Sequence, residues 1–324
     1  MIVWLLRRLV QAIFIVLAMT IIVFIGLHAV GSPVDTLISQ NATEAQRQEL
    51  ISQFGFDQPI WRQYLFFVNG ILRGDFGRSF VYNEPALSLI MSRFPATLEL
   101  AVFSVSVSVL IGIPAGLFSG LYPEARLSRG FMAGSILGFS LPTFWLGLML
   151  VMIFSIQLGW LPSSGRGQTA ELLGVKWSIL TVDGWKHLAL PGATLALFNI
   201  SMVIRLTRAG VREVLPMDYI KFARAKGLHP SRIISVHVLK NIMIPIVTIL
   251  GLDFGTTIAF TVVTESVFAW PGTGKLIVDS INFLDRPVVV SYLILVVVLF
   301  VLINLITDIF YKILDPRIQL EAES

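Results

Sequence analysis

The segment Pro287–Thr307, PVVVSYLILVVVLFVLINLIT, runs for 21 residues without Asp, Glu, Lys or Arg. The hydrocarbon core of a bilayer is about 30 Å thick, so a helix that crosses it needs roughly 20 apolar residues in succession. This segment is therefore long enough to cross a membrane as one helix. It predicts that at least part of the chain is surrounded by lipid.

Five more stretches that are nearly free of charge precede this one. The run over residues 130–165 is too long for one straight helix, so we expect its helix to end near Leu158 and a loop to follow. The run that starts at Asn241 is interrupted only by Asp253. The sequence thus predicts an all-α polytopic membrane protein with six transmembrane helices, at about residues 9–30, 98–121, 131–158, 188–208, 241–264 and 288–311.

The composition of the whole chain agrees with this class. Hydrophobic residues make up 55% of the 324 residues and charged residues only 14%, whereas an average soluble domain has roughly 25% charged residues. The chain has no cysteine, which excludes disulfides and thiolate metal sites. The formal net charge is +4. Because the basic residues lie at helix ends and in one long loop, they indicate a lipid bilayer and no nucleic acid as partner.

The first apolar run follows Arg7 and Arg8, an arrangement that a signal peptide shares. The run has 26 uncharged residues, which is too long for a signal peptide, and no small-residue cleavage site follows it. We therefore expect it to be a retained first helix.

The basic residues also predict the orientation. Six spans place both termini on one side of the membrane; that side would hold 14 Lys and Arg residues, and the opposite side 10 that are spread over many more residues. Basic residues close to helix ends favour the cytoplasm. We therefore expect cytoplasmic termini, an outer (periplasmic) segment over residues 31–97 that contains the aromatic helix Ile60–Leu72, and a basic cytoplasmic loop over residues 209–240.

Glycines recur at four-residue spacing within the predicted spans, at positions 112, 116 and 120, at 134 and 138, and at 251 and 255. Such spacing lets two helix backbones approach closely, and plain bundle packing is the simpler interpretation. Pro114, Pro142 and Pro245 are expected to bend their helices or to start them.

The sequence lacks the motifs of common catalytic sites. Its four histidines form no HExxH pair, and there is no GxSxG, so neither a zinc protease nor a serine hydrolase is indicated. The segment Trp270–Leu276, WPGTGKL, lacks the spacing and the Ser or Thr of a phosphate-binding loop. We interpret it as a Pro/Gly turn, and we predict no catalytic residue, no metal site and no cofactor bound by this chain.

The long basic loop contains the most informative segment, Asp218–Leu228, DYIKFARAKGL. Asp218 is placed to start a short helix by accepting amide hydrogens of its first turn. Gly227 is placed to end that helix in the left-handed conformation, and Pro230 then opens a second helix.

Two short basic helices could lie on anionic lipid. The small residues favour a protein groove instead, because Ala223 and Ala225 beside Gly227 form a closely approachable surface from which Arg224 and Lys226 project. We therefore expect this segment to insert into a partner protein.

Asp218–Leu228 resembles the coupling-loop motif of permeases in the dipeptide, oligopeptide, nickel and glutathione branch of ABC importers. One departure lies within this segment, where Lys221-Phe222-Ala223 stands in place of the family's usual Glu-Ala-Ala. Further motifs of this branch follow in order along nearly the whole chain: Leu6–Leu9 (LRRL), Gly55–Pro59 (GFDQP), Gly74–Ser79 (GDFGRS), Phe94–Leu98 (FPATL), Leu190–Pro191, Arg205–Arg208 (RLTR), Val263–Gly274 (VTESVFAWPGTG) and Asp315–Arg317 (DPR).

The resemblance implies a type I ABC importer permease fold in a bacterial or archaeal inner (cytoplasmic) membrane. It also implies a non-catalytic subunit, with ATP and Mg bound by partner chains. Those partners would be a homologous second permease, two ATP-binding-cassette ATPase subunits and an extracytoplasmic solute-binding protein. The residues that the motif assigns to ATPase coupling are Asp218, Tyr219, Ala223, Arg224, Ala225, Lys226 and Gly227.

Asp253 is the candidate residue on the substrate path, where similar permeases usually have glutamine. A charge that faces hydrocarbon at this depth costs at least about 2.5–3.5 kcal/mol. Gly251 and Gly255 lie about 200° around the helix from Asp253. If they pack against a neighbouring helix, Asp253 faces the centre of the bundle. The alternative is that Asp253 hydrogen-bonds another helix and only stabilises the bundle.

Other functions remain as alternatives at this stage. The same machinery could carry a nickel chelate, glutathione, an opine or an oligosaccharide in place of peptides. A secondary transporter or channel would need charges along an ion route, and the spans offer little beyond Asp253, Glu99 and Asp308. A membrane-embedded enzyme would need paired polar catalytic groups at one depth, and the sequence has none.

Overall fold

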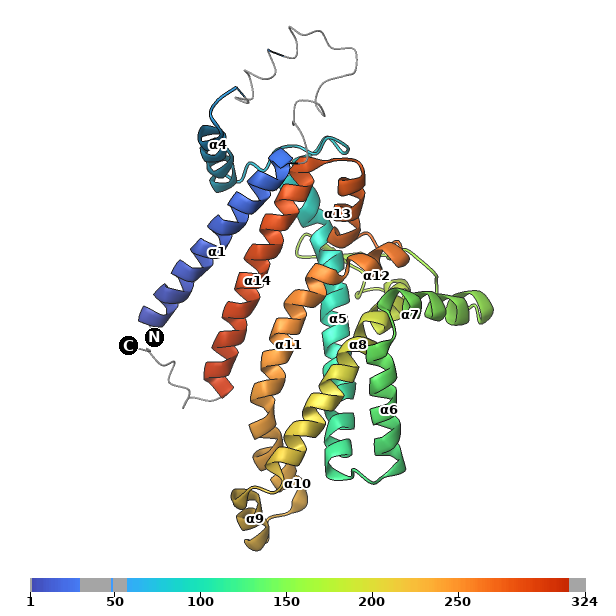
Figure 1. The fold of residues 1–324 in the computed structure, drawn as a ribbon. Coiled ribbons are helices and arrows are strands. Elements are labelled where there is room, and N and C mark those ends of the chain that lie inside the picture. The colour runs from blue at the N-terminus through green and yellow to red at the C-terminus, as the bar shows by residue number, and fades with distance from the viewer. Residues whose placement is uncertain (1, 30–47, 49–56, 315–324) are drawn as a thin grey trace. The chain divides into compact units, whose positions relative to one another are not determined.

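The computed structural model describes residues 2–29, 48 and 57–314 of the chain (Figure 1). Residues 31–47 and 49–56 of the predicted outer segment and the motif Asp315–Arg317 lie outside the described residues. The chain divides into two compact units, one formed by residues 1–93 and 276–301 and the other by residues 94–275 and 302–324. Within the described residues nearly all regular structure is helical.

The first unit is built around the contact between its first and last helices. Val23 packs with Val290 and Ile294 in a small apolar core. The aromatic helix predicted over residues 60–72 lies against the first helix, where Tyr64 Oη is 2.9 Å from Thr20 Oγ1. The helices of this unit are α1 (Ile2–Ala29), α4 (Ile60–Leu72), the start of α5 (Ala86–Leu121), most of α13 (Thr273–Asn282) and most of α14 (Arg286–Leu314).

The second unit contains the rest of α5 and the last turns of α14, with α8 at its centre. Helices α6, α7, α11 and α12 all pack against α8 (Figure 1). The remaining elements are α6 (Arg126–Ser140), α7 (Thr143–Leu150), η1 (Val151–Gln157), β1 (Ala170–Leu172), β2 (Val175–Trp177), α8 (Val182–Val214), α9 (Asp218–Ala225), α10 (Pro230–Arg232), η2 (Ile233–Leu239), α11 (Lys240–Phe260) and α12 (Val262–Val267).

A stripe of glycines lets α5 approach α8 closely. A Cβ atom added at Gly112 would lie 2.8 Å from Val203 Cβ, and one added at Gly116 would lie 2.6 Å from Thr207 Cβ. The same holds for Gly120, where the added Cβ would lie 2.6 Å from a side-chain carbon of α8. Real Cβ contacts are longer than this, so larger residues would push the two helices apart. The expected packing role of this stripe is confirmed.

The predicted third helix, over residues 131–158, is two helices. Its two parts, Arg126–Ser140 and Thr143–Gln157, meet at an angle of 108°. The break falls at Pro142, the N-cap residue of α7, and Leu141 before it has an extended backbone. A proline has no amide hydrogen to donate, and it forces the preceding residue out of the helical region. Pro142 thus starts a helix, as expected, but the turn that it makes is much sharper than a bend within one span.

The other predicted helices exist, and their bounds differ from the predicted ones. α5 begins at Ala86 rather than 98, α8 covers Val182–Val214 rather than 188–208, and α11 follows η2 without a break. Among the described residues, four helices are long and apolar enough to cross a membrane, namely Ala86–Leu121, Val182–Val214, Pro230–Ile258 and Arg286–Thr307; the bent pair would make a fifth.

The described residues also include a β-hairpin, which departs from the all-α prediction. β1 and β2 pair antiparallel, with Leu172 opposite Val175. Only Leu173 and Gly174 join the two strands, and both have a positive φ, of 56° and 76°. The hairpin follows the loop that we predicted after Leu158.

Candidate functional site

The predicted coupling segment forms the short helix α9, Asp218–Ala225. Its N-cap residue is Met217, and no side chain caps the helix. The Asp218 carboxylate instead accepts a hydrogen bond from Lys221 Nζ at 2.8 Å. An acidic group in the first turn still stabilises the helix through its dipole. The predicted start of the helix is confirmed, whereas the predicted capping bond of Asp218 is wrong.

The end of α9 is a tight backbone motif built on Gly227. Leu228 N donates to Ala223 O at 3.2 Å, and Gly227 N donates to Arg224 O at 2.9 Å. Gly227 has a φ of 72°, in the left-handed region. These two bonds around a left-handed glycine form a Schellman motif, which satisfies carbonyl groups that the helix end would otherwise leave unpaired. The predicted termination at Gly227 is confirmed.

The inner face of α9 is anchored in an apolar cluster. Ile220 and Ala223 are buried, whereas Ala225 is exposed. Residues two apart on a helix point about 200° away from one another. Ala223 and Ala225 therefore do not form the single small surface that the sequence suggested. The other buried members of the cluster are Val211, Ile233, Val238, Ile242 and Ile246.

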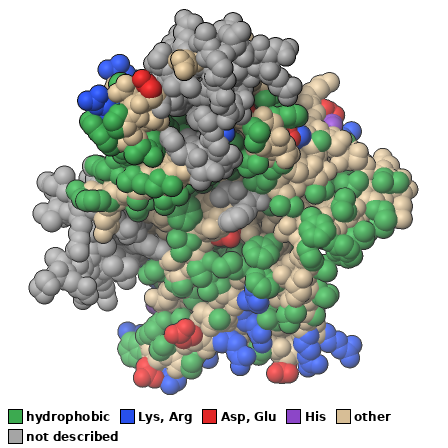
Figure 2. All heavy atoms as spheres, turned by 45° about the horizontal axis from the view of Figure 1, so that its top comes forward, with side chains coloured by type: hydrophobic (Ala, Val, Ile, Leu, Met, Phe, Trp, Pro, Cys, Tyr) green, Lys and Arg blue, Asp and Glu red, His purple; other side chains and the backbone are tan. Residues whose placement is uncertain are grey.

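The outer face of α9 is basic and partly aromatic. Lys226 Nζ lies 4.5 Å from the centre of the Phe222 ring, a cation–π contact on an exposed side chain. Lys and Arg side chains gather at the lower end of the view in Figure 2, the end at which Figure 1 shows α9, α10 and the turn between α5 and α6. The exposed side of α9 thus carries cations and two aromatic rings, Tyr219 and Phe222.

Tyr219 connects α9 to the long helix α11. Its hydroxyl accepts a hydrogen bond from Asn241 Nδ2 at 3.1 Å. Because Asn241 lies in the first turn of α11, a displacement of α9 would act directly on that helix. The shared apolar cluster makes the same connection through Ile220, Ile242 and Ile246.

Asp253 is half-buried on α11, about three turns from Asn241 and so away from α9. Gly251 packs against Thr307 of α14 so closely that a Cβ atom at 251 would overlap the threonine hydroxyl. One turn beyond Asp253, Thr257 is buried beside Asn199 of α8, whose amide donates to Ser104 Oγ of α5 at 3.1 Å. Within the part of the chain that the structure describes, no side chain pairs with the Asp253 carboxylate.

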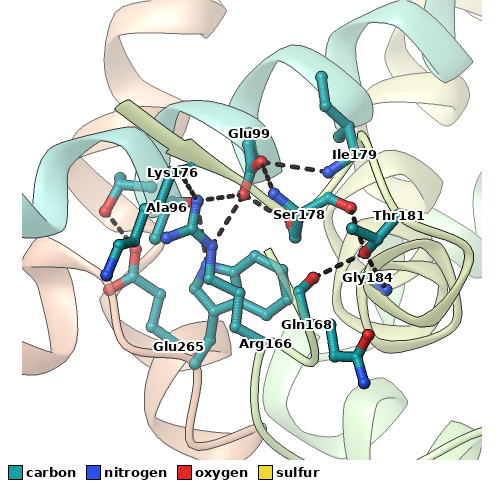
Figure 3. Close-up of polar contacts among 12 residues, drawn as sticks. Ala96, Glu99, Arg166, Gln168, Lys176, Ser178, Ile179, Thr181, Gly184 and Glu265 are labelled. Carbon is teal, nitrogen blue, oxygen red and sulfur yellow. Dashed lines mark hydrogen bonds and ion pairs between the residues drawn. The ribbon is translucent and has the colours of Figure 1, made fainter. Parts of the chain in front are cut away.

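A buried carboxylate lies at Glu99 of α5, which the sequence analysis named only as one of the few charges in the spans. Figure 3 shows it surrounded by donors from the loop that contains the hairpin. Arg166 binds it with Nε at 3.0 Å and Nη2 at 2.7 Å, and Ser178 Oγ donates to it at 2.7 Å. The backbone amides of Ser178 and Ile179 donate to its other oxygen. This network ties the loop to α5.

A second buried carboxylate, Glu265 of α12, binds the turn that follows it. It accepts hydrogen bonds from Thr97 Oγ1 at 2.7 Å and from Lys275 N at 2.9 Å. Trp270 Nε1 donates to Ala96 O at 2.9 Å. The interpretation of WPGTGKL as a turn holds for Trp270–Gly272, whereas Thr273–Leu276 already form the first turn of α13. Glu265 and Trp270 join this segment to the motif FPATL. The only sequence signals for either carboxylate were their positions at the ends of apolar runs.

Among the described residues, no three His, Asp or Glu side chains are grouped as a metal would require. The fold is that of a helical protein with several candidate membrane spans, and it exposes the short basic helix α9.

Family models match almost the whole chain. Residues 112–320 match the binding-protein-dependent transport system inner membrane component family, and residues 1–101 match the N-terminal membrane component of the same systems. The chain therefore belongs to the family of binding-protein-dependent transport system inner membrane components. It is the non-catalytic permease subunit of an ABC importer, and ATP is bound by the ATPase subunits of such importers.

Curated relatives agree over nearly full length. The chain is 38% identical to the oligopeptide transport system permease protein AppB of Bacillus subtilis (strain 168), over 98% of this chain and 99% of the relative. It is 36% identical to the di/tripeptide transport system permease protein DppB of Pseudomonas aeruginosa (strain UCBPP-PA14), over 89% and 90%. It is 35% identical to the glutathione transport system permease protein GsiC of Escherichia coli (strain K12), over 98% of both chains.

A solved structure shares the fold at low identity. An inward-facing conformation of the MetNI methionine ABC transporter matches with a TM-score of 0.56 and 18% identity, over 72% of this chain and 99% of that chain. The expected ABC importer permease fold is thereby confirmed for the larger part of the chain.

Proposed function

We propose that this chain forms half of the membrane path of an importer for di- and oligopeptides. The carrying observation is that relatives at 35–38% identity over nearly the whole chain are named for di/tripeptide, oligopeptide and glutathione transport. All three cargo types contain amide-linked amino acids. The same machinery carrying a nickel chelate, an opine or an oligosaccharide is the alternative.

The proposed topology has six spans. α1, the bent pair α6 and α7–η1, and the four long helices supply them, and both termini then lie in the cytoplasm. Residues 31–97 and the hairpin loop lie outside, and residues 209–240 lie inside. The concentration of Lys and Arg in residues 205–240 supports this orientation.

The proposed role of α9 is coupling. The residues from Asp218 to Gly227 would dock into an ATPase subunit through their exposed face, while Ile220 and Ala223 hold the helix to the permease. Closure of the ATPases on ATP would displace α9, and the bond from Asn241 to Tyr219 would pass that displacement to α11. Because α11 also carries Asp253, a movement at the ATPase surface reaches the helix that we propose lines the path.

The proposed complex has one further permease, homologous to this chain, two ATPase subunits and an external solute-binding protein. Reconstitution of that complex into liposomes provides the test. We expect uptake of labelled dipeptide or oligopeptide that requires both ATP and the binding protein. Identification of the ligand that co-purifies with the binding protein then fixes the cargo.

Two outcomes would contradict the proposal. Uptake of a nickel chelate or oligosaccharide without any peptide uptake would show that the proposed cargo class is wrong. Uptake that persists without ATP but stops when the proton gradient is collapsed would indicate a secondary transporter.

A further inference from the structure

The β-hairpin Ala170–Trp177 exposes apolar side chains at its tip. Leu173 is 94% exposed and Leu172, its neighbour on β1, is 52% exposed. Leu173 also has a φ of 56°, in the left-handed region. A two-residue hairpin loop with two positive φ values favours Asn-Gly or Asp-Gly, and a leucine there is costly. Leucine at this position is thus unfavourable for two reasons. Its large apolar side chain is exposed, and its backbone has a positive φ.

The base of this hairpin is held rigidly. Arg166 Nη2 donates to the Lys176 carbonyl of β2 at 2.8 Å, in addition to binding Glu99 (Figure 3). Ser178, directly after β2, donates to Glu99 from both its hydroxyl and its amide. The side chain of Glu99 is fully buried. A short hairpin is marginal alone, so these bonds fix the direction in which its tip points.

The stem of the hairpin is charged. Glu171 and Lys176 are paired across the two strands and both are exposed. A carboxylate or ammonium group in hydrocarbon costs several kcal/mol, so the stem favours a position outside the hydrocarbon core. This charge favours a partner that stands outside the membrane as the occupant of the tip.

The small size of the tip indicates a transient partner, which binds and dissociates. Permanent subunit interfaces are large and mostly apolar, whereas this tip offers two leucines between solvated charges of both signs. A central apolar anchor surrounded by polar residues is typical of a transient interface. The family to which the chain belongs depends on a binding protein, which must dock and dissociate in each cycle.

We propose that the hairpin is a preformed contact for the solute-binding protein, with Leu173 as its anchor and a shallow apolar pocket of the binding protein as the receptor. This inference rests on the proposed function, because it requires the hairpin loop to lie outside. Glu99 and Arg166 are positioning residues in it, since they act only by holding the hairpin.

Leu173→Asn separates docking from stability. Asparagine suits the left-handed position better than leucine, so the variant should unfold at the same temperature or higher. In the reconstituted complex, the concentration of binding protein that half-maximally stimulates ATP hydrolysis should rise about tenfold. Basal hydrolysis without binding protein should not change.

Leu284→Asn is the matched control, because Leu284 is also an exposed leucine with a φ of 56°. We expect no change in the half-maximal concentration for this variant. An equal rise in both variants, or no rise in Leu173→Asn while the native complex is stimulated, would overturn the inference. A native complex that the binding protein does not stimulate would instead contradict the proposed function.

Crosslinking identifies the occupant directly. The chain has no cysteine, so Leu173→Cys can carry a single photoreactive label in the assembled complex. We expect an adduct with the binding protein that disappears when excess unlabelled native complex competes. Adducts only with lipid or with the second permease would overturn the inference.

Discussion

Glu265 on α12 accepts a hydrogen bond from the hydroxyl of Thr97 on α5 at 2.7 Å, and both side chains are wholly buried. The same carboxylate binds Lys275 N at the start of α13. Residues far apart in the sequence, in two separate motifs, therefore meet at one acidic group. The glycine at 272 is required for this contact, because a Cβ atom there would overlap the carboxylate.

The first prediction is that Glu265→Ala destabilises the folded permease. A buried donor that loses its acceptor costs about 1–3 kcal/mol, and the variant removes the carboxylate that accepts from Thr97 Oγ1 and Lys275 N. We expect a clearly lower unfolding temperature of the purified complex, measured by fluorescence-detected size exclusion after heating. Ser266→Ala is the control, since Ser266 is exposed and bonds only to Val262 O of its own helix. Equal unfolding temperatures for the two variants would refute the prediction.

The second prediction concerns Gly227, the residue that ends α9. The structure has no atom within 4 Å of a Cβ placed there, so a substitution is penalised only through its backbone conformation. A β-branched residue in the left-handed region costs about 1–2 kcal/mol. Gly227→Val should therefore distort the end of α9 and lower peptide uptake about 5–30-fold, while the complex still assembles.

Gly227→Asn provides the matched control, because asparagine tolerates the left-handed conformation. We expect this variant to transport nearly as well as the native chain. Uptake and ATP hydrolysis measured in the same liposomes distinguish loss of coupling from loss of protein. Normal uptake by Gly227→Val would remove the support for α9 as the coupling element.

The sequence predicted those features that depend on local backbone chemistry. Gly227 and Pro142 were found because a left-handed end and a missing amide are properties of one residue type. The close helix contact at Gly112 followed from spacing along a single helix, but its partner Val203 did not. The size of the bend at Pro142 did not follow, because it depends on how α7 packs against α8.

The sequence did not predict the features that join distant segments. Glu99 and Arg166 are 67 residues apart, and nothing local to either indicates the other. The hairpin was also missed, since its strands have three residues each and Leu173 stands where a turn normally has Asn or Asp. That violation of turn preference is the feature from which we infer a partner contact.

The third prediction tests the orientation. Arg224→Cys on α9 should be inaccessible to an impermeant thiol reagent in intact cells and should be labelled in inverted vesicles. Leu65→Cys on α4, an exposed position of the proposed outer segment, should show the opposite pattern. The absence of native cysteine makes the labelling specific. Labelling of position 224 from outside would reverse the topology.

The last prediction is that Asp253 faces the translocation path and favours cargo with positive charge. Gly251, two residues away, packs on Thr307 of α14, so the opposite face of α11, where Asp253 lies, points away from that contact. Thr257, one turn along the same face, is buried beside Asn199 of α8. This places polar groups from two helices along the side of α11 that carries the carboxylate.

Asp253→Asn keeps the size and the hydrogen-bonding capacity of the side chain and removes only its charge. If the carboxylate lines the path, uptake of basic peptides should fall relative to acidic peptides by at least about threefold, as expected for the loss of one partly screened attraction. Gly251→Val is the comparison variant, because it should separate α11 from α14 and lower the yield of assembled complex without altering selectivity. A structural role of Asp253 affects assembly, whereas a role in the path affects the ratio of basic to acidic cargo. If Asp253→Asn lowers the yield of complex and leaves that ratio unchanged, as expected for Gly251→Val, Asp253 only stabilises the bundle.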